Sequence, residues 1–440
     1  MANQYMQEED DAILKTYNRY PVVLDHGDGA YLYDPEGKKY LDFSAGYAVS
    51  SLGYNNKEFN DALKAQIDKM IHTSNLYYNT TCGKAGEDLK KITGMYKVFF
   101  TNSGGEAIEG AIKTARKYAY TKKTGRYEFI AMENSFHGRS MGAVALTGHK
   151  EYREPFEPVM PGVHFAIYND LDSVKALVND KTCAIILETI QGEGGINAAT
   201  KEFMQGIRKI CDENGILMIC DEVQCGMGRS GAWFAWQQMG ITPDIMTMAK
   251  AIGSGVPVGA FAMTKEVADN SLVPGDHGTT YGGNPLCCAA VSKTIEIFEK
   301  EHMLDHVNEI APYLTQKLQE IVDTCDAAVK VKGRGLIQGL QITKPLGEVT
   351  AKALEEGLLI IGAGTDVIRM IPPLVIGKEQ VDEMAEILKK STCIKSVPDK
   401  NKRIKEPVIG YTFRRKGGMK DDRIFYCPAV GSADECAGGI

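Results

Sequence analysis

The 440-residue sequence contains no apolar run that approaches the roughly 18 residues of a membrane-spanning helix. Its acidic start, MANQYMQEEDD, lacks the basic and apolar regions that form a signal peptide. The formal net charge of -7 is ordinary for a cytosolic protein. These absences lead us to expect a cytoplasmic protein that has neither a membrane nor a nucleic acid as its partner.

The eleven cysteines are scattered along the chain and form no C-x-x-C pair, the spacing that is typical of zinc and redox sites. Several lie in apolar runs such as ILMIC and LCCAAV, where cysteine behaves as a small hydrophobic residue. We therefore expect reduced thiols, with no disulfide framework and no metal site.

Neither internal repeats nor low-complexity tracts occur, and a content of 44% hydrophobic residues provides apolar material for large cores. Strand-like apolar runs alternate with helix-like periodic runs from KVFFTNS to ILMICDE. This alternation predicts an α/β domain over residues 60–300, with a mostly parallel sheet and helices on both faces.

The flanking segments follow other patterns. Long amphipathic helices and a short strand region predict a smaller α+β domain over residues 301–395, to which residues 1–59 contribute. The tail, residues 396–440, carries the basic runs KNKRIK and FRRKGGMK among prolines and glycines. We expect this tail to be a disordered extension, with a patch for an acidic partner as the alternative.

Polar residues follow three of the predicted strands, at the edge where open parallel sheets bind ligands. Ser103, Gly104 and Gly105 follow KVFF and open a helix, whose N–H groups either bind a phosphate or are simply capped. Asp221 follows ILMIC and needs a partner for its charge, which a structural salt bridge could also supply. Lys250 follows IMTMA, where loss of water would lower its pKa and favour Schiff-base chemistry; the alternative is a lysine that reaches solvent.

An anion site, a carboxylate and an amine together match the needs of pyridoxal phosphate. A dinucleotide site is the competing interpretation, because GMGRSG at 226–231 fits G-x-G-x-x-G. However, DEVQC separates Cys220 from the first glycine, and Asp244 opens the next strand instead of closing it. An NAD-dependent dehydrogenase is therefore the weaker hypothesis. A third class, a non-catalytic binding protein with the same fold, would be expected to lack the lysine or the carboxylate, and both are present.

The motifs TNSGGEAIEGAIKTARKY, SFHGR, QGEGG, CDEVQCGMGR, MAKAIGSG, HGTTYGGNPL and IRMIPPLVI carry a family resemblance. From about residue 17 to 390 the sequence resembles the class III aminotransferases, and most closely their acetylornithine and ornithine aminotransferase group. The resemblance implies the aspartate-aminotransferase-type fold (fold type I), pyridoxal phosphate as cofactor, and a homodimer with a shared active site.

The resemblance also implies roles for the cofactor-binding residues. Lys250 would be the Schiff-base lysine, Asp221 the partner of the pyridinium nitrogen, and Gln224 the contact to the phenolic oxygen. Phe136 would stack on the ring. The phosphate would be held by Ser103, Gly104 and Gly105, with Thr280 from a second subunit. Two positions depart from the family: Gly105 replaces the usual threonine, and Thr189 replaces the usual proline.

Four residues are expected to bind substrates. The resemblance implies that Arg139 grips a carboxylate, that Glu193 and Arg369 form a switchable pair, and that Tyr47 contacts the donor. The alternatives are surface and structural ion pairs for the charged residues and core packing for the tyrosine. The expected reaction moves the amino group of N-acetylornithine to 2-oxoglutarate, giving N-acetylglutamate 5-semialdehyde and glutamate in arginine biosynthesis. Ornithine and 4-aminobutyrate remain alternative donors.

Overall fold

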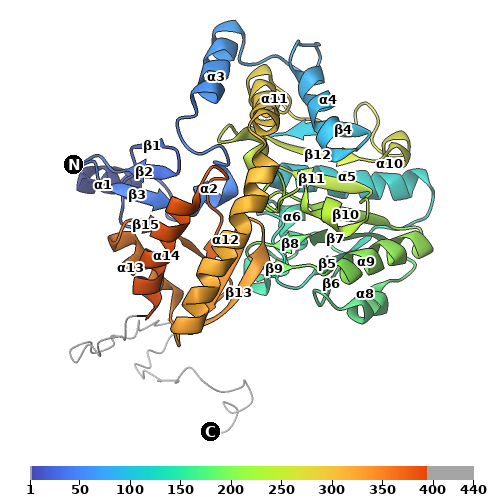
Figure 1. The fold of residues 1–440 in the computed structure, drawn as a ribbon. Helices are drawn as coiled ribbons and strands as arrows, with labels where there is room; N and C mark the ends of the chain where they lie inside the picture. The colour runs from blue at the N-terminus through green and yellow to red at the C-terminus, as the bar shows by residue number, and fades with distance from the viewer. Residues whose placement is uncertain (1, 394–440) are drawn as a thin grey trace, which may run out of the picture. The chain divides into compact units, whose positions relative to one another are not determined.

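Seven strands form the central sheet, in the spatial order β4 (Lys97–Thr101), β12 (Gly259–Met263), β11 (Ile245–Met248), β10 (Leu217–Asp221), β7 (Thr182–Glu188), β5 (Glu128–Met132) and β6 (Val163–Ala166) (Figure 1). The computed structural model describes residues 2–393, so the prediction for residues 396–440 lies outside the described part. All neighbouring strands are parallel except for β12, which runs antiparallel to β4 and β11. The predicted α/β fold with a mostly parallel sheet is confirmed.

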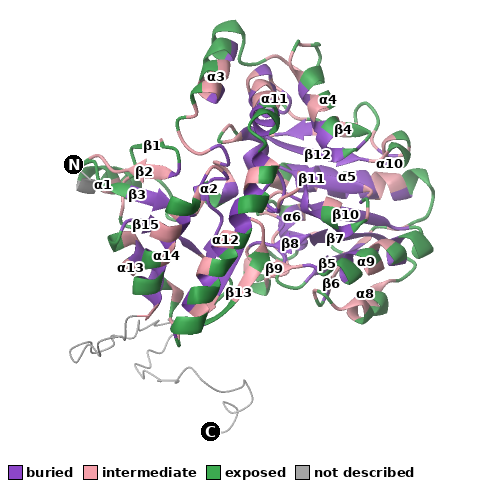
Figure 2. Cartoon of the chain, viewed as in Figure 1, coloured by how far each residue is buried: buried purple, intermediate pink, exposed green. Residues whose placement is uncertain are grey.

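The central sheet is covered on both faces, and β7 shows how the sequence achieves this. Ile185 and Leu187 belong to the core that includes helix α9 (Lys201–Asn214). Ile186 points the other way, into the core that includes helix α5 (Gly104–Thr121). Figure 2 shows these strands buried between the helices. A strand that is covered on both faces must be apolar throughout, which explains continuous runs such as CAIILE.

The C-terminal part of the described chain builds an antiparallel sheet in the order β13 (Ala328–Arg334), β14 (Ile337–Ile342), β17 (Val367–Met370) and β16 (Ile361–Ala363). Helices α12 (Met303–Thr324), α13 (Leu346–Glu355) and α14 (Lys378–Cys393) accompany it (Figure 1). This is the α+β arrangement that the amphipathic helices predicted. The boundaries at residues 60, 300 and 395 stay predictions.

The N-terminal segment forms a further sheet with a C-terminal strand. Its order is β1 (His26–Asp28), β2 (Tyr31–Tyr33), β3 (Lys39–Asp42) and β15 (Leu358–Leu359). Because β15 pairs in parallel with β3, residues far apart in the sequence share this sheet.

The remaining elements are mostly short. They are α1 (Ala2–Ala12), α2 (Ala45–Ala48), α3 (Lys57–Lys69), α4 (Cys82–Thr93), α6 (Met141–Ala145), α7 (Lys150–Arg153), η1 (Glu154–Phe156), α8 (Leu171–Leu177), β8 (Ile190–Gln191), β9 (Asn197–Ala198), η2 (Ala235–Met239), η3 (Lys250–Gly253), α10 (Lys265–Asp269) and α11 (Pro285–Lys300). Within residues 2–393, no helix combines the length and the apolar character that crossing a bilayer requires.

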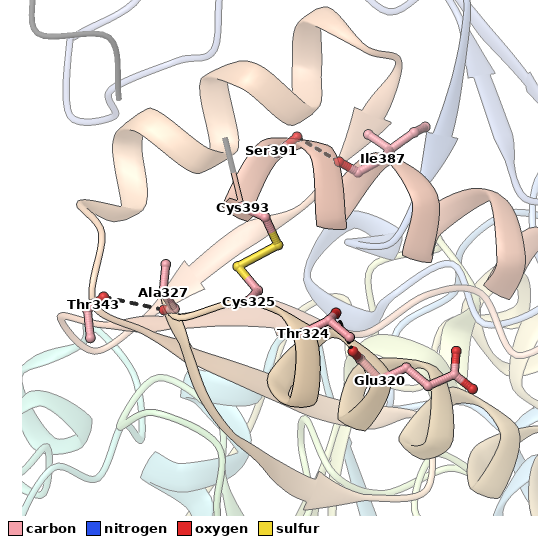
Figure 3. The surroundings of a disulfide bond; sticks show 8 residues. All are labelled: Glu320, Thr324, Cys325, Ala327, Thr343, Ile387, Ser391 and Cys393. Atoms are coloured by element: carbon pink, nitrogen blue, oxygen red, sulfur yellow. Dashed lines mark hydrogen bonds between the residues drawn. A yellow bond between two sulfur atoms is a disulfide. The ribbon is translucent and has the colours of Figure 1, made fainter. Parts of the chain in front are cut away.

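Cys325 and Cys393 are joined by a disulfide, so the expectation of reduced thiols is wrong for this pair (Figure 3). Cys325 directly follows α12 and Cys393 ends α14. These two helices pack against each other, which brings the Cα atoms within 5.3 Å although the residues are 68 positions apart. Sequence spacing could not show this pairing, because it arises from helix packing. The other seven cysteines of the described residues are free.

We expect Cys393→Ser to lower the free energy of unfolding by about 2–4 kcal/mol, because the unfolded chain is then no longer restricted by the cross-link. Chemical denaturation without reductant measures this difference. Addition of reductant should bring the original protein to the stability of the variant and leave the variant unchanged. An equal effect of reductant on both proteins would contradict the prediction.

Candidate active site

A cavity of about 380 Å³ lies at the carboxyl ends of the central strands. The three polar strand ends predicted from the sequence meet here, since β4, β10 and β11 all end at this edge. The predicted site residues in its lining are Ser103, Gly104, Gly105, Phe136, Glu193, Asp221, Gln224 and Lys250. Glu188 and His137, which sequence reasoning did not identify, line it as well.

Lys250 lies two residues beyond β11 and has an unusual environment. Its φ angle of +52° lies in the left-handed region, which is uncommon for a residue with a side chain. Its amine makes no hydrogen bond or ion pair with any of the residues 2–393. Loss of water and the nearby guanidinium of Arg369 lower the pKa of Lys250 to about 8. The amine is therefore partly neutral near physiological pH, as a nucleophile or base requires.

Asp221 ends β10 and is buried, and three groups hold its carboxylate. Oδ1 accepts hydrogen bonds from the Val223 backbone N–H at 3.0 Å and from the Thr247 hydroxyl at 3.2 Å. Oδ2 lies 2.7 Å from Nδ1 of His137, whose side chain is also buried. Burial alone would lower the pKa of His137, but the hydrogen bond to Asp221 and the charges of Asp221 and Glu188 together outweigh it, and the pKa is raised. The partner that Asp221 needs is therefore this histidine.

The N-terminus of α5 opens onto the cavity, because Ser103, Gly104 and Gly105 are part of its lining. The Ser103 hydroxyl also caps the helix by accepting the Glu106 N–H at 3.2 Å. A β-carbon at Gly104 would lie 2.9 Å from Val223, so glycine is required there. At Gly105, a β-carbon would lie at least 3.8 Å from the nearest atom. Glycine is therefore not needed there to avoid a clash, and the threonine that is usual in the family would leave its β-carbon in free space.

Glu188, the last residue of β7, connects two loops of the site. Its carboxylate accepts the Phe136 N–H at 3.0 Å and the Gly192 N–H at 3.1 Å. Burial raises the pKa of Glu188 to about 7, although His137 opposes this shift. In the sequence, Glu188 ends an apolar run in the same way as Asp221 does. The same argument could therefore have identified it as a candidate site residue.

Arg369 on β17 is almost fully buried and pairs with Glu193. Nη1 donates to Oε1 of Glu193 at 2.8 Å and to Oε1 of Gln224 at 3.1 Å, and Nη2 donates to Oε2 of Glu193 at 3.3 Å. The guanidinium also lies 5.2 Å from the ring centre of Tyr47. Tyr47 is half-exposed beside this pair and does not pack in the core.

Four predicted site residues are not part of this cavity's lining. Arg369 and Tyr47 lie beside Glu193, as described above, whereas Arg139 and Thr280 lie elsewhere. Arg139 is exposed, with its guanidinium 5.3 Å from the ring centre of Phe136 and 4.1 Å from that of Tyr152. Thr280 lines a separate hollow together with Asn75 and Leu76. A single chain therefore does not bring Thr280 to Lys250.

Thr189, the second departure from the family, contacts a buried carboxylate next to the site. Its hydroxyl donates to Oε1 of Glu222 at 2.6 Å. Glu222 also accepts the backbone N–H groups of Ala235 and Trp236. Burial raises the pKa of Glu222 to about 7. This threonine thus satisfies one oxygen of a carboxylate that water does not reach.

The GMGRSG motif does not support a dinucleotide site. Residues 223–230 form consecutive turns, and neither a strand directly before the first glycine nor a helix directly after the motif is present. Asp244 precedes β11 and pairs with Arg208. The dehydrogenase interpretation is therefore wrong.

Comparison with known proteins gives consistent matches. Residues 13–392 match the family model described as Aminotransferase class-III. The acetylornithine aminotransferase of Aquifex aeolicus is 44% identical over 378 residues, which cover 86% of this chain and 98% of that protein. The solved structure of the ornithine aminotransferase from Toxoplasma gondii, with partial occupancy of PLP at its active site, has a TM-score of 0.86 and 29% identity, covering 89% and 94% of the two chains. The acetylornithine aminotransferase from Elizabethkingia anophelis has a TM-score of 0.80 and 29% identity, covering 89% and 98%.

We expect Lys250→Met to stabilise the cofactor-free protein at pH 7, because folding then no longer removes a charged amine from water. The pKa change from 10.5 to about 8 corresponds to up to about 3 kcal/mol. The destabilisation by lysine is fully present below pH 8, where the folded protein carries the charge. It disappears as the pH rises through 10.5, where the unfolded chain also loses its proton.

Denaturation of both cofactor-free proteins between pH 7 and pH 10 measures this difference. The advantage of the variant should shrink as the pH rises. An advantage that stays constant over this range would show that the charge of Lys250 is not its cause.

Proposed function

The chain belongs to the class III aminotransferases, and we propose that it transfers the amino group of N-acetylornithine to 2-oxoglutarate. The products are N-acetylglutamate 5-semialdehyde and glutamate, in a step of arginine biosynthesis. The observation that carries this proposal is the meeting of Lys250, Asp221 and the N-terminus of α5 in one cavity. The curated acetylornithine aminotransferases above 40% identity favour N-acetylornithine as the donor. The solved structures do not separate the two donors, because the ornithine aminotransferase from Toxoplasma gondii and the acetylornithine aminotransferase from Elizabethkingia anophelis are both 29% identical to this chain.

The cavity fits pyridoxal phosphate, which, when bound, draws electrons away from the substrate carbon that bears the amine. Residues 103–105 would hold the phosphate through the N–H groups and dipole of α5. Phe136 would cover the ring, Asp221 would face the pyridine nitrogen, and Gln224 would face the phenolic oxygen. Lys250, an amine without a partner among residues 2–393, is available for covalent attachment.

Lys250 is also suited to move protons during the reaction. With a pKa of about 8, it can accept a proton from the substrate carbon and return one near physiological pH. Asp221 supplies a fixed negative charge at the cavity wall, held in orientation by His137 and Thr247. In this proposal Lys250 transfers the proton, and the negative charge of Asp221 stabilises a protonated pyridine ring.

The Glu193–Arg369 pair is suited to act as a switch between two kinds of substrate. When the pair is closed, the guanidinium is neutralised, which suits a donor without a second carboxylate at that place. When glutamate or 2-oxoglutarate enters, its α-carboxylate takes Arg369 while Arg139 holds the distal carboxylate. The exposed fraction of Glu193, 24% against 1% for Arg369, supports this, since only the glutamate has room to move.

A homodimer with a shared site fits the exposed surface around Thr280. Leu76, Tyr77, Tyr78 and Tyr281 are all strongly exposed, and Leu76 lines the same hollow as Thr280. A patch of large apolar side chains is typical of a protein–protein interface. A second copy covering this patch would allow Thr280 to reach the phosphate site of its partner.

Turnover of three donors with 2-oxoglutarate tests the reaction. We expect kcat/KM for N-acetylornithine to exceed the values for ornithine and 4-aminobutyrate by at least about tenfold, because specificity is a difference in transition-state affinity. Lys250→Ala is the control: it should stay folded and retain the cofactor without turnover, because residues 103–105 and Asp221 are unchanged. A higher kcat/KM for either of the other donors would contradict the proposal.

We expect Glu193→Ala to free Arg369 and to favour glutamate over N-acetylornithine. Single-turnover rates of the two half-reactions should shift their ratio by about tenfold toward glutamate. An equal fall in both rates would show that Glu193 only supports the fold.

A further inference from the structure

A second cavity, of about 810 Å³, lies at the C-terminal end of α5. Its lining comes from the last turns of α5, from the loop that leads to β5, and from residues 269–273, where α10 ends. The N-terminus of the same helix opens onto the cavity of Lys250. Since α5 has 18 residues that each rise about 1.5 Å, roughly 27 Å separate its two ends. This second cavity is therefore distinct from the candidate active site.

The lining of the second cavity carries an excess of positive charge. Its basic side chains are Arg116, Lys117, Lys123 and Arg126. Lys117 pairs with Asp276 at 3.0 Å, and Asp269, the one carboxylate in the lining, pairs with Lys265. Within residues 2–393, the other three cations have no carboxylate at ion-pair distance. We call this hollow the basic cavity, because three of its charges are not neutralised by the chain.

Two of these three cations are held in fixed positions by backbone carbonyls. Nε of Arg116 donates to the Tyr127 carbonyl and Nη2 to the Pro161 carbonyl, both at 3.2 Å. Nη1 of Arg126 donates to two carbonyls at the C-terminal end of α9, both at 2.8 Å. A guanidinium has five N–H donors, so each arginine keeps three that these bonds do not use. The carbonyls orient the two groups but leave their charges uncompensated.

Both guanidinium groups act on the same buried side chain, which places them close together. Burial raises the pKa of the Cys183 thiol to about 12, and the charges of Arg116 and Arg126 both oppose this rise. Glu128 adds to the rise, but its carboxylate does not line the basic cavity. It is bound instead by His164 at 3.0 Å and by Asn179 at 3.1 Å.

We propose that the basic cavity binds a small anion that carries several phosphoryl groups, and that Arg116, Lys123 and Arg126 are its ligands. The planar fork of a guanidinium matches two phosphate oxygens, and three cations together require more than one negative charge. Donors that are already oriented lose little freedom when an anion binds. The volume also falls within the range of small-molecule sites, about 300–1,000 Å³. This binding activity goes beyond the transamination proposed above.

Isothermal titration calorimetry of the holoenzyme with sodium tripolyphosphate tests the proposal, at about 0.15 M salt, where attraction between distant exposed charges is screened. We expect saturable binding that Lys123→Met weakens about fivefold and Arg126→Gln about tenfold, because each change removes charge-assisted hydrogen bonds. Arg126→Lys, which keeps the charge without the fork, should bind with an affinity between those of the original protein and Arg126→Gln. Orthophosphate should bind at least about tenfold more weakly than tripolyphosphate, because it offers fewer charges.

The matched control is Lys122→Met. Lys122 directly precedes Lys123 and carries the same charge, but it lies outside the lining and pairs with Glu266 at 2.7 Å. Its replacement should leave the affinity for tripolyphosphate unchanged. The absorbance of the bound cofactor should also stay constant during the titration, because the basic cavity is distant from Lys250.

Several results would overturn the proposal. The absence of saturable binding would do so directly. An equal loss of affinity in Lys122→Met and Lys123→Met would show diffuse attraction to a basic surface, and release of the cofactor would show binding at the phosphate site of the active site. Tighter binding of a poly-glutamate peptide than of tripolyphosphate would identify an acidic protein segment as the occupant.

The test remains decisive if one variant is lost. Arg126 binds the end of α9, so Arg126→Gln could fail to fold. Lys123 forms no hydrogen bond or ion pair within the described part of the chain, and Lys123→Met then decides alone. None of these measurements needs turnover, so their outcome does not depend on which amine donor the enzyme uses.

Discussion

The hydrogen bond between Asp221 and His137 allows a negative charge to persist at the end of a sheet that is otherwise apolar. A carboxylate buried without partners would take up a proton or destabilise the fold by several kcal/mol. Here one oxygen accepts two donors and the other faces a buried imidazole. His137 directly follows Phe136, so the partner of the buried charge and the aromatic wall of the cavity lie on the same loop.

Glu188 extends this coupling to the substrate side. Its two oxygens bind the backbone N–H groups of Phe136 and Gly192. The first residue belongs to the wall for the cofactor ring, and the second directly precedes Glu193. One buried carboxylate therefore joins the ring wall to the loop that carries Glu193, whose partner Arg369 is 176 positions away in the sequence.

The strand ends and the family motifs predicted the central sheet and eight residues of the cavity lining, because apolar runs and the residues that end them are local features. Strand β12 was not identified, since GAFAM lies between glycine-rich and helical segments and resembles either. His137 was missed because its partner is 84 positions away. The Cys325–Cys393 disulfide depends in the same way on how α12 and α14 pack, which no spacing rule contains. Glu188 could have been found by the argument that found Asp221.

The hydroxyl of Thr189 bears on attempts to stabilise the protein by replacing unusual residues with the family consensus. Such replacements commonly raise stability by a fraction of a kcal/mol to about 2 kcal/mol. At position 189 the consensus proline has no hydroxyl, and Glu222 would lose the donor that lies 2.6 Å from its Oε1. Oε1 would keep one donor, the Trp236 N–H at 3.0 Å, so the expected cost is that of one lost hydrogen bond, about 0.5–1.5 kcal/mol. Replacement of Thr189 by the consensus proline is therefore expected to lower the stability of this chain.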